Sequence, residues 1–186
     1  MQRTASQTVG PFFLDALIHA GDAIINKPGA AGESISIAGG VFDGEGNPVA
    51  DAFLEVYQAD STGRYVADSR EARAGMCFSG FGRAATDQFG QFRFDTILPG
   101  GIQRAGSAAD APHLDVMVFA RGLLKPLVTR IYFHGNAANA TDPVLLQVQP
   151  NRRHTLEARR VQSAEKENWQ WDVRLQGKDE TVFFDF

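Results

Sequence analysis

The chain has 186 residues, of which 44% are hydrophobic and 14 are phenylalanine, so an intrinsically disordered protein is excluded and one compact domain is expected. Its net charge is −4 and it has no basic block, which argues against nucleic acid or an anionic membrane as a partner. The single Cys77 excludes an intrachain disulfide framework, and with neither a signal peptide nor a transmembrane run to be read, a cytoplasmic protein is expected.

The N-terminal segment carries little regular pattern. We predict an arm over residues 1–33 and a β domain over residues 34–186. Short helices are expected within residues 12–20 and after Pro150, although neither segment has a long 3.6-residue apolar period. The adjacent Phe12 and Phe13 lie in an arm that offers little structure to bury them. We therefore expect the arm to pack on something else, such as a second subunit.

From residue 34 onward, short segments rich in Val, Ile, Leu and Phe alternate with glycine and proline turns. Residues 34–41 alternate polar with apolar side chains, as a strand with one wet face does. The sequence of residues 43–48, Asp-Gly-Glu-Gly-Asn-Pro, is typical of a turn. Strands are expected at residues 34–41, 52–58, 92–96, 114–120, 127–133, 145–148, 155–160, 169–175 and 181–184. The pattern predicts an all-β fold, a mostly antiparallel β-sandwich of about nine short strands.

One pair of residues has the spacing of metal ligands. His113 and Asp115 are two positions apart, so on a strand their side chains share a face. A third ligand from His134 or His154 would complete a ferrous site of two histidines and one carboxylate. In the alternative reading, His113 is a hydrogen-bonded residue at the start of a strand and Asp115 is a surface or interface charge. Cys77 is expected to be a buried, inert thiol.

Eight short motifs along the chain together resemble those of a known protein family. They are SQTVGPF (6–12), GNPVADAFLEVYQAD (46–60), GRY (63–65), FGRAATD (81–87), TILPG (96–100), APH (111–113), FARG (119–122) and IYF (131–133). In this order they resemble the intradiol ring-cleaving dioxygenases, over about residues 4–186. Within that family the chain is most similar to a subunit that lacks the iron.

The resemblance implies a chemistry and also shows where this chain departs from it. The family holds Fe(III) with two tyrosines and two histidines and opens a catechol ring with O2. His113 stands in the first histidine position, but Asp115 stands in the second. Gly101-Ile102 replaces one tyrosine, and residues 69–74 contain no candidate for the other. The resemblance therefore implies a subunit with no catalytic residue and no metal ligand of its own, whose iron is bound by a partner beta subunit.

The resemblance also implies substrate-binding residues at the boundary between the two subunits. Arg121 is expected to face the carboxylate of an aromatic acid substrate, because a guanidinium suits a carboxylate. Thr8, Gly10 and Pro11 of the arm are expected to form part of the pocket wall, since Gly-Pro lets backbone approach a flat ring. Assembly into a higher-order alpha–beta oligomer is implied as well.

Two other functions compete with this interpretation. One is a transthyretin-like β-sandwich that serves only as a binding module, against which the arm motif at 6–12 and the FARG motif at 119–122 argue. The other is a self-contained ferrous oxygenase that uses His113 and Asp115. Metal analysis of the chain purified alone would separate the second from a subunit without iron.

Overall fold

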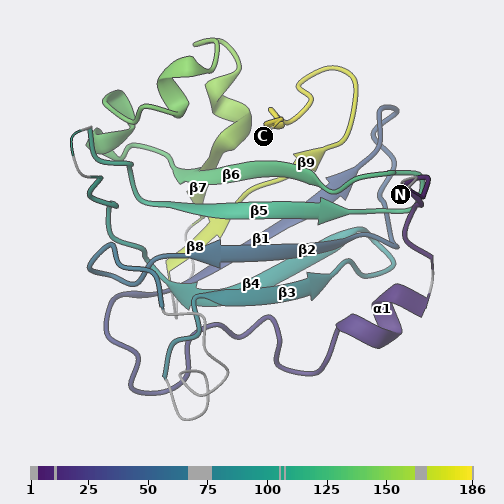
Figure 1. The fold of residues 1–186 in the computed structure, drawn as a ribbon, viewed down its shortest axis with the longest axis horizontal. Helices are drawn as coiled ribbons and strands as arrows, with labels where there is room; N and C mark the ends of the chain where they lie inside the picture. The colour runs from purple at the N-terminus through teal and green to yellow at the C-terminus, as the bar shows by residue number, and fades with distance from the viewer. Residues whose placement is uncertain are drawn as a thin grey trace.

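The computed structural model describes residues 4–10, 12–66, 77–104, 106, 108–161 and 167–185 (Figure 1). Within them one short α-helix, α1 (Phe12–Leu17), precedes the strands, in agreement with the helix expected within residues 12–20. The strands are β1 (Ser34–Phe42), β2 (Phe53–Gln58), β3 (Phe81–Ala85), β4 (Gln91–Ile97), β5 (His113–Phe119), β6 (Leu127–Phe133), β7 (Glu157–Val161), β8 (Glu167–Gln170) and β9 (Val173–Arg174). Three 3-10 helices, η1 (Ala137–Ala140), η2 (Leu145–Gln147) and η3 (Arg153–Leu156), connect β6 to β7.

The strands form one mixed sheet that curls into a nearly closed barrel. Its order is β3-β2-β5-β6-β7-β8-β1-β4, and β9 pairs with β1. The two end strands, β3 and β4, are in contact with each other, so the sheet almost meets itself. Strand β6 runs parallel to β7, and β1 runs parallel to both β8 and β9. The prediction of a mostly antiparallel sandwich is therefore wrong, while the all-β class holds.

A long connection accounts for the parallel pairing of β6 and β7. Residues 134–156 run from the end of β6 through η1 to η3, and the chain returns beside β6 in the same direction. Parallel neighbours require a crossover of a dozen or more residues, whereas antiparallel neighbours can be joined by a two-residue turn. Such a crossover joins residues that no local pattern relates.

The predicted elements that fail lie in or near this connection. The strand expected at 145–148 is η2, and that expected at 181–184 forms an isolated bridge between Phe184 and Val128.

Strand β3, which the sequence pattern does not predict, turns the small residues Gly82 and Ala84 inward. Cys77 is exposed, so the prediction of a buried thiol is wrong.

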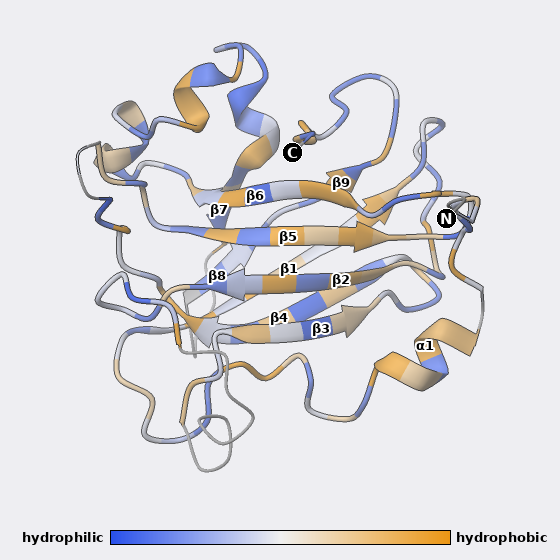
Figure 2. Ribbon diagram, in the orientation of Figure 1, coloured by the Kyte–Doolittle hydropathy of each residue, from blue (hydrophilic) through white to orange (hydrophobic). Residues whose placement is uncertain are grey.

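The core fills the inside of the curled sheet. Apolar residues alternate with polar ones along the neighbouring strands β2 and β5 (Figure 2), so that Leu54 and Val56 of β2 lie beside Val116 of β5 on the inner face of the sheet. The opposite, outer face of these strands carries the residues that concern function. None of the described helices is long and apolar enough to span a membrane.

The N-terminal arm packs on this outer face. The ring of Phe13 in α1 stacks on Phe53 of β2 at 5.9 Å between centroids, and Phe53 stacks on Phe119 of β5 at 4.4 Å. Phe53 is fully buried as a result, although it points away from the core. Its neighbour Phe12 is 82% exposed, so this large apolar side chain of the arm is not covered by the rest of the chain.

Candidate functional site

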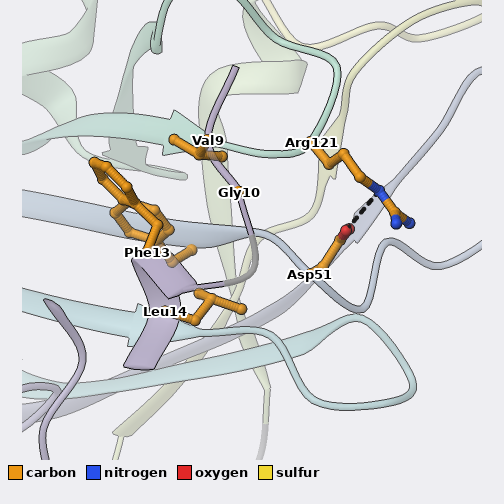
Figure 3. Close-up of a pocket in the computed structure, with 7 residues that line it drawn as sticks. Val9, Gly10, Phe13, Leu14, Asp51 and Arg121 are labelled. Atoms are coloured by element: carbon orange, nitrogen blue, oxygen red, sulfur yellow. Dashed lines mark ion pairs between the residues drawn. The ribbon is translucent and has the colours of Figure 1, made fainter. Parts of the chain in front are cut away.

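A pocket of about 100 Å³ lies between the arm and the adjoining ends of β2 and β5 (Figure 3). It is lined by Val9, Gly10, Phe13, Leu14, Asp51, Phe53 and Arg121. The antiparallel register pairs Phe53, the first residue of β2, with Phe119, the last residue of β5. Asp51 and Arg121 each lie two residues beyond that pair, so the register brings the two side chains together at the rim of the pocket.

The two charged side chains form an ion pair. Nε of Arg121 lies 3.0 Å from Oδ2 of Asp51, and the side chains are 78% and 38% exposed. In Figure 3 the terminal nitrogens of Arg121 extend beyond Asp51, away from Phe13 and Leu14. The pair is thus open to solvent, and the terminal nitrogens of the guanidinium face away from the chain's own pocket.

The arm residues that the resemblance singles out have different surroundings. The hydroxyl of Thr8 accepts a hydrogen bond of 2.7 Å from the backbone N–H of Gly122, so Thr8 ties the arm to the loop that carries Arg121. Gly10 lines the pocket, and its carbonyl accepts from the N–H of Phe13 at the start of α1. Pro11 lies outside the described residues. The structure therefore brings Arg121 and Gly10 into one pocket, with Thr8 on the adjacent cleft.

His113 and Asp115, the residues in the two histidine positions, lie near the beginning of β5 on its outer face. Nδ1 of His113 is 2.7 Å from the carbonyl oxygen of Ala111, and its Nε2 is 3.6 Å from Oδ1 of Asp115. The ring is buried, and this burial lowers the pKa of His113 below its ordinary value, with Arg130 contributing in the same direction. His113 is therefore held as a neutral imidazole.

Two arginines supply the positive charge of this region. Nε of Arg130 in β6 donates to Oδ1 of Asp115 at 2.8 Å, and its Nη1 lies 3.7 Å from Oδ2 of the fully buried Asp110. Asp110 is bound more closely by Arg104, whose Nε donates to the same oxygen at 3.0 Å. The hydroxyl of Tyr65 donates to the other oxygen of Asp115 at 3.2 Å. Burial and the charge of Asp115 raise the pKa of Tyr65 above its ordinary value, so the phenol stays protonated. We call Asp110, His113, Asp115 and Arg130 the Arg130 cluster.

This donor set does not fit the ferric ion of the family that the sequence resembles. The resemblance implies a ferric site with two tyrosinate oxygens, whereas here the hydroxyl of Tyr65 donates a hydrogen bond to Asp115. Asp115 is already paired with a guanidinium, and a second cation beside Arg130 would be repelled.

The ferrous site considered above, with His134 or His154 as the third ligand, is not assembled in the described residues either. His134 pairs with Glu157 at 2.7 Å and His154 lies 3.7 Å from Asp179. In the part of the chain that the structure describes, no three His, Cys, Asp or Glu side chains are grouped so that they could hold a metal ion.

Two charged residues of these regions were not identified by sequence reasoning. Asp51 lies inside the GNPVADAFLEVYQAD motif, but only the register of β2 and β5 shows that it meets Arg121. Arg130 interrupts the apolar run Leu-Val-Thr-Arg-Ile-Tyr-Phe of β6, and an arginine in such a run is a signal of a buried partner. The partner itself, Asp115, faces Arg130 directly across β5 and β6.

Comparison with known proteins adds an independent line of evidence. The family model described as "Dioxygenase" matches residues 8–177. The chain is 44% identical over its whole length to the protocatechuate 3,4-dioxygenase alpha chain of Burkholderia cepacia, of which it covers 98%. It is 34% identical to the beta chain of that enzyme from the same organism, over 81% of this chain and 67% of the other. Among solved structures, a chlorocatechol 1,2-dioxygenase from Pseudomonas putida superposes with a TM-score of 0.66 and 20% identity, over 89% of this chain and 69% of the other, and shares the fold.

Proposed function

The chain belongs to the dioxygenase family, and from that premise we propose that it is the alpha-type subunit of a protocatechuate 3,4-dioxygenase. The assembled enzyme would cleave the ring of protocatechuate with O2, between the two hydroxylated carbons, to give 3-carboxy-cis,cis-muconate. The observation that carries the proposal is the similarity to an alpha chain along the full length of both proteins. This similarity, arm included, favours an enzyme subunit over a transthyretin-like binding module.

The proposal assigns the iron to a beta-type partner. Support comes from the Arg130 cluster, where the carboxylate of Asp115 is paired with the guanidinium of Arg130 and is not available to a metal ion. In the partner, Fe(III) would supply the Lewis acid that draws electron density from the bound catecholate. The residues of this chain would bind and orient the substrate and exclude water from one side of it.

Within that scheme we assign roles to the residues at the arm. Arg121 would receive the carboxylate of protocatechuate, because its exposed guanidinium can form two parallel hydrogen bonds with a carboxylate. Gly10 and Pro11 would form a wall against the substrate ring, and Thr8 would hold that wall in place through Gly122. We also propose a cytoplasmic location, in keeping with the single Cys77, and a higher-order alpha–beta assembly.

Reconstitution tests the proposal. The chain expressed alone is expected to be colourless, to bind no stoichiometric iron and to show no ring cleavage, since one imidazole and one paired carboxylate leave a ferric ion mostly to water. Co-expression with a beta-type subunit is expected to yield a coloured complex that consumes O2 and protocatechuate in equal amounts. A tyrosinate-to-iron absorption band from the isolated chain would contradict the proposal.

A further inference from the structure

The ion pair at the rim of the pocket has a second member to which no role has been assigned. We infer that Asp51 is a positioning residue, which holds the guanidinium of Arg121 in the orientation that receives the carboxylate of the substrate. The inference rests on the proposed function and extends it to a residue that need not touch the substrate.

The geometry of the pair turns the two terminal nitrogens of the guanidinium outward. Nε of Arg121 lies 3.0 Å from Oδ2 of Asp51. These terminal nitrogens are the pair that binds a carboxylate with two parallel hydrogen bonds. In Figure 3 they lie beyond Asp51, on the side away from the chain's own pocket. Asp51 therefore directs the fork outward, toward a ligand held by a neighbouring subunit.

Both residues stand on backbone that is held in place. The N–H of Ala52, next to Asp51, donates to the hydroxyl of Thr86, and that hydroxyl donates back to the carbonyl of Ala52. Beside Arg121, the N–H of Gly122 donates to Thr8. With both backbones anchored, the flexible part is the long side chain of Arg121 itself. An arginine that is 78% exposed has many rotamers, and a fixed carboxylate at Nε removes most of them.

The same carboxylate has an opposite effect through its charge. Asp51 lines the pocket, so its negative charge repels a substrate carboxylate that approaches Arg121. The two effects predict opposite results when the charge of Asp51 is removed. The repulsion acts over a longer distance than the 3.0 Å ion pair, so solvent and salt weaken the repulsion more than the attraction. Ordering of the side chain is then the larger effect, and loss of Asp51 weakens binding of the anionic substrate.

Steady-state kinetics of the assembled alpha–beta enzyme tests the inference. Asp51→Asn is expected to raise KM for protocatechuate about 3- to 10-fold, the effect of freeing one long side chain, with kcat little changed. Catechol lacks the carboxylate, so its KM is expected to stay the same. Asp51→Glu, which restores the carboxylate, is expected to recover at least half of the loss. Asp179→Asn removes one exposed carboxylate elsewhere on the surface and serves as the matched control.

Several results would overturn the inference. A lower KM for protocatechuate in Asp51→Asn would mean that Asp51 acts as a repelling charge, and equal changes with both substrates would mean a purely structural role. Arg121→Ala, measured in parallel, separates this inference from the proposed function. Loss of protocatechuate selectivity in Arg121→Ala but not in Asp51→Asn overturns the role of Asp51 alone. No loss in Arg121→Ala overturns both roles, even if the assembled enzyme is active.

Discussion

An arginine–aspartate pair lies near each end of strand β5, and the two pairs have similar distances but differ in the exposure of the arginine. Arg121 and Asp51 lie 3.0 Å apart just beyond the last residue of β5, with side chains that are 78% and 38% exposed. Arg130 and Asp115 lie 2.8 Å apart near its first residue, and the side chain of Arg130 is only 10% exposed. Arg130 also reaches toward Asp110, whose side chain is fully buried.

The difference in burial separates a structural pair from one that is available to a ligand. In the exposed pair, the guanidinium of Arg121 is 78% exposed while Asp51 lies at its Nε, so Arg121 can take up a carboxylate ligand from the solvent side. In the Arg130 cluster the guanidinium itself is buried, and its removal leaves Asp115 without its charge partner and the buried Asp110 with Arg104 alone. A short distance between charges therefore does not distinguish the two pairs, whereas the exposure of the arginine does, since only the guanidinium of Arg121 is open to a ligand.

The largest expected effect is on stability, at the buried pair. Arg130→Met is expected to lower the free energy of unfolding by about 2 to 3 kcal/mol, because it removes the charged hydrogen bond to Asp115 and leaves the buried Asp110 with Arg104 as its remaining charge partner. Arg121→Met, the same change at the exposed pair, is expected to cost less than about 0.5 kcal/mol. Urea denaturation followed by tryptophan fluorescence measures both. Equal losses would remove the distinction between the two pairs.

The second effect is on turnover, and it falls on the exposed pair. Arg121→Ala in the assembled enzyme is expected to lower kcat/KM for protocatechuate about 10- to 100-fold, equivalent to about 1.4 to 2.8 kcal/mol. The Coulomb attraction of a carboxylate at about 4 Å sets an upper limit near 4 kcal/mol before desolvation is subtracted. The iron content is expected to stay the same. Catechol provides the control, and a loss as large with catechol would show that Arg121 acts through structure.

A smaller effect is expected where the arm is tied to the exposed pair. Thr8→Val removes the acceptor of the Gly122 N–H, a single hydrogen bond worth about 1 kcal/mol. The arm is then expected to be cleaved several-fold faster in limited proteolysis. The alpha–beta complex is expected to dissociate already at a higher protein concentration than the wild-type complex does. Thr8→Ser keeps the hydroxyl and is expected to match the wild type. If both variants behave alike, the arm is held by the Phe13–Phe53 contact and not by Thr8.

The smallest effect concerns pH and belongs to the Arg130 cluster. Because burial lowers the pKa of His113 in the folded state, protons bind the unfolded chain more readily. The contribution of His113 to stability is complete above its ordinary pKa of about 6.5 and is lost as the pH falls toward its lowered value. The unfolding free energy of His113→Asn is thus expected to vary less between pH 7 and 5 than that of the wild type. Arg121→Met is expected to keep the wild-type slope, and a flattened slope in that variant would contradict this assignment.

Much of the strand content follows from the sequence, because alternation of side chains reports directly on a two-faced strand. The strand expected at 127–133 coincides with β6, and those expected at 34–41 and 114–120 differ from β1 and β5 by one residue. Strand β3 escapes detection because its inward residues are Gly82 and Ala84, which carry no hydrophobic signal. The segment 145–148 is apolar enough for a strand, but it belongs to a crossover whose path depends on distant contacts.

The sequence by itself determined the all-β class and most of the strands, since these depend on which side chain stands at each place in the chain. Tertiary structure alone decided that the sheet is mixed and curls on itself, that Asp51 meets Arg121, and that Arg130 faces Asp115. The physical reason is that pairing of strands joins residues that are distant along the chain, 15 positions for Arg130 and Asp115 and 70 positions for Arg121 and Asp51. Local periodicity indicates which face a residue takes, and only the register of neighbouring strands indicates what lies opposite it.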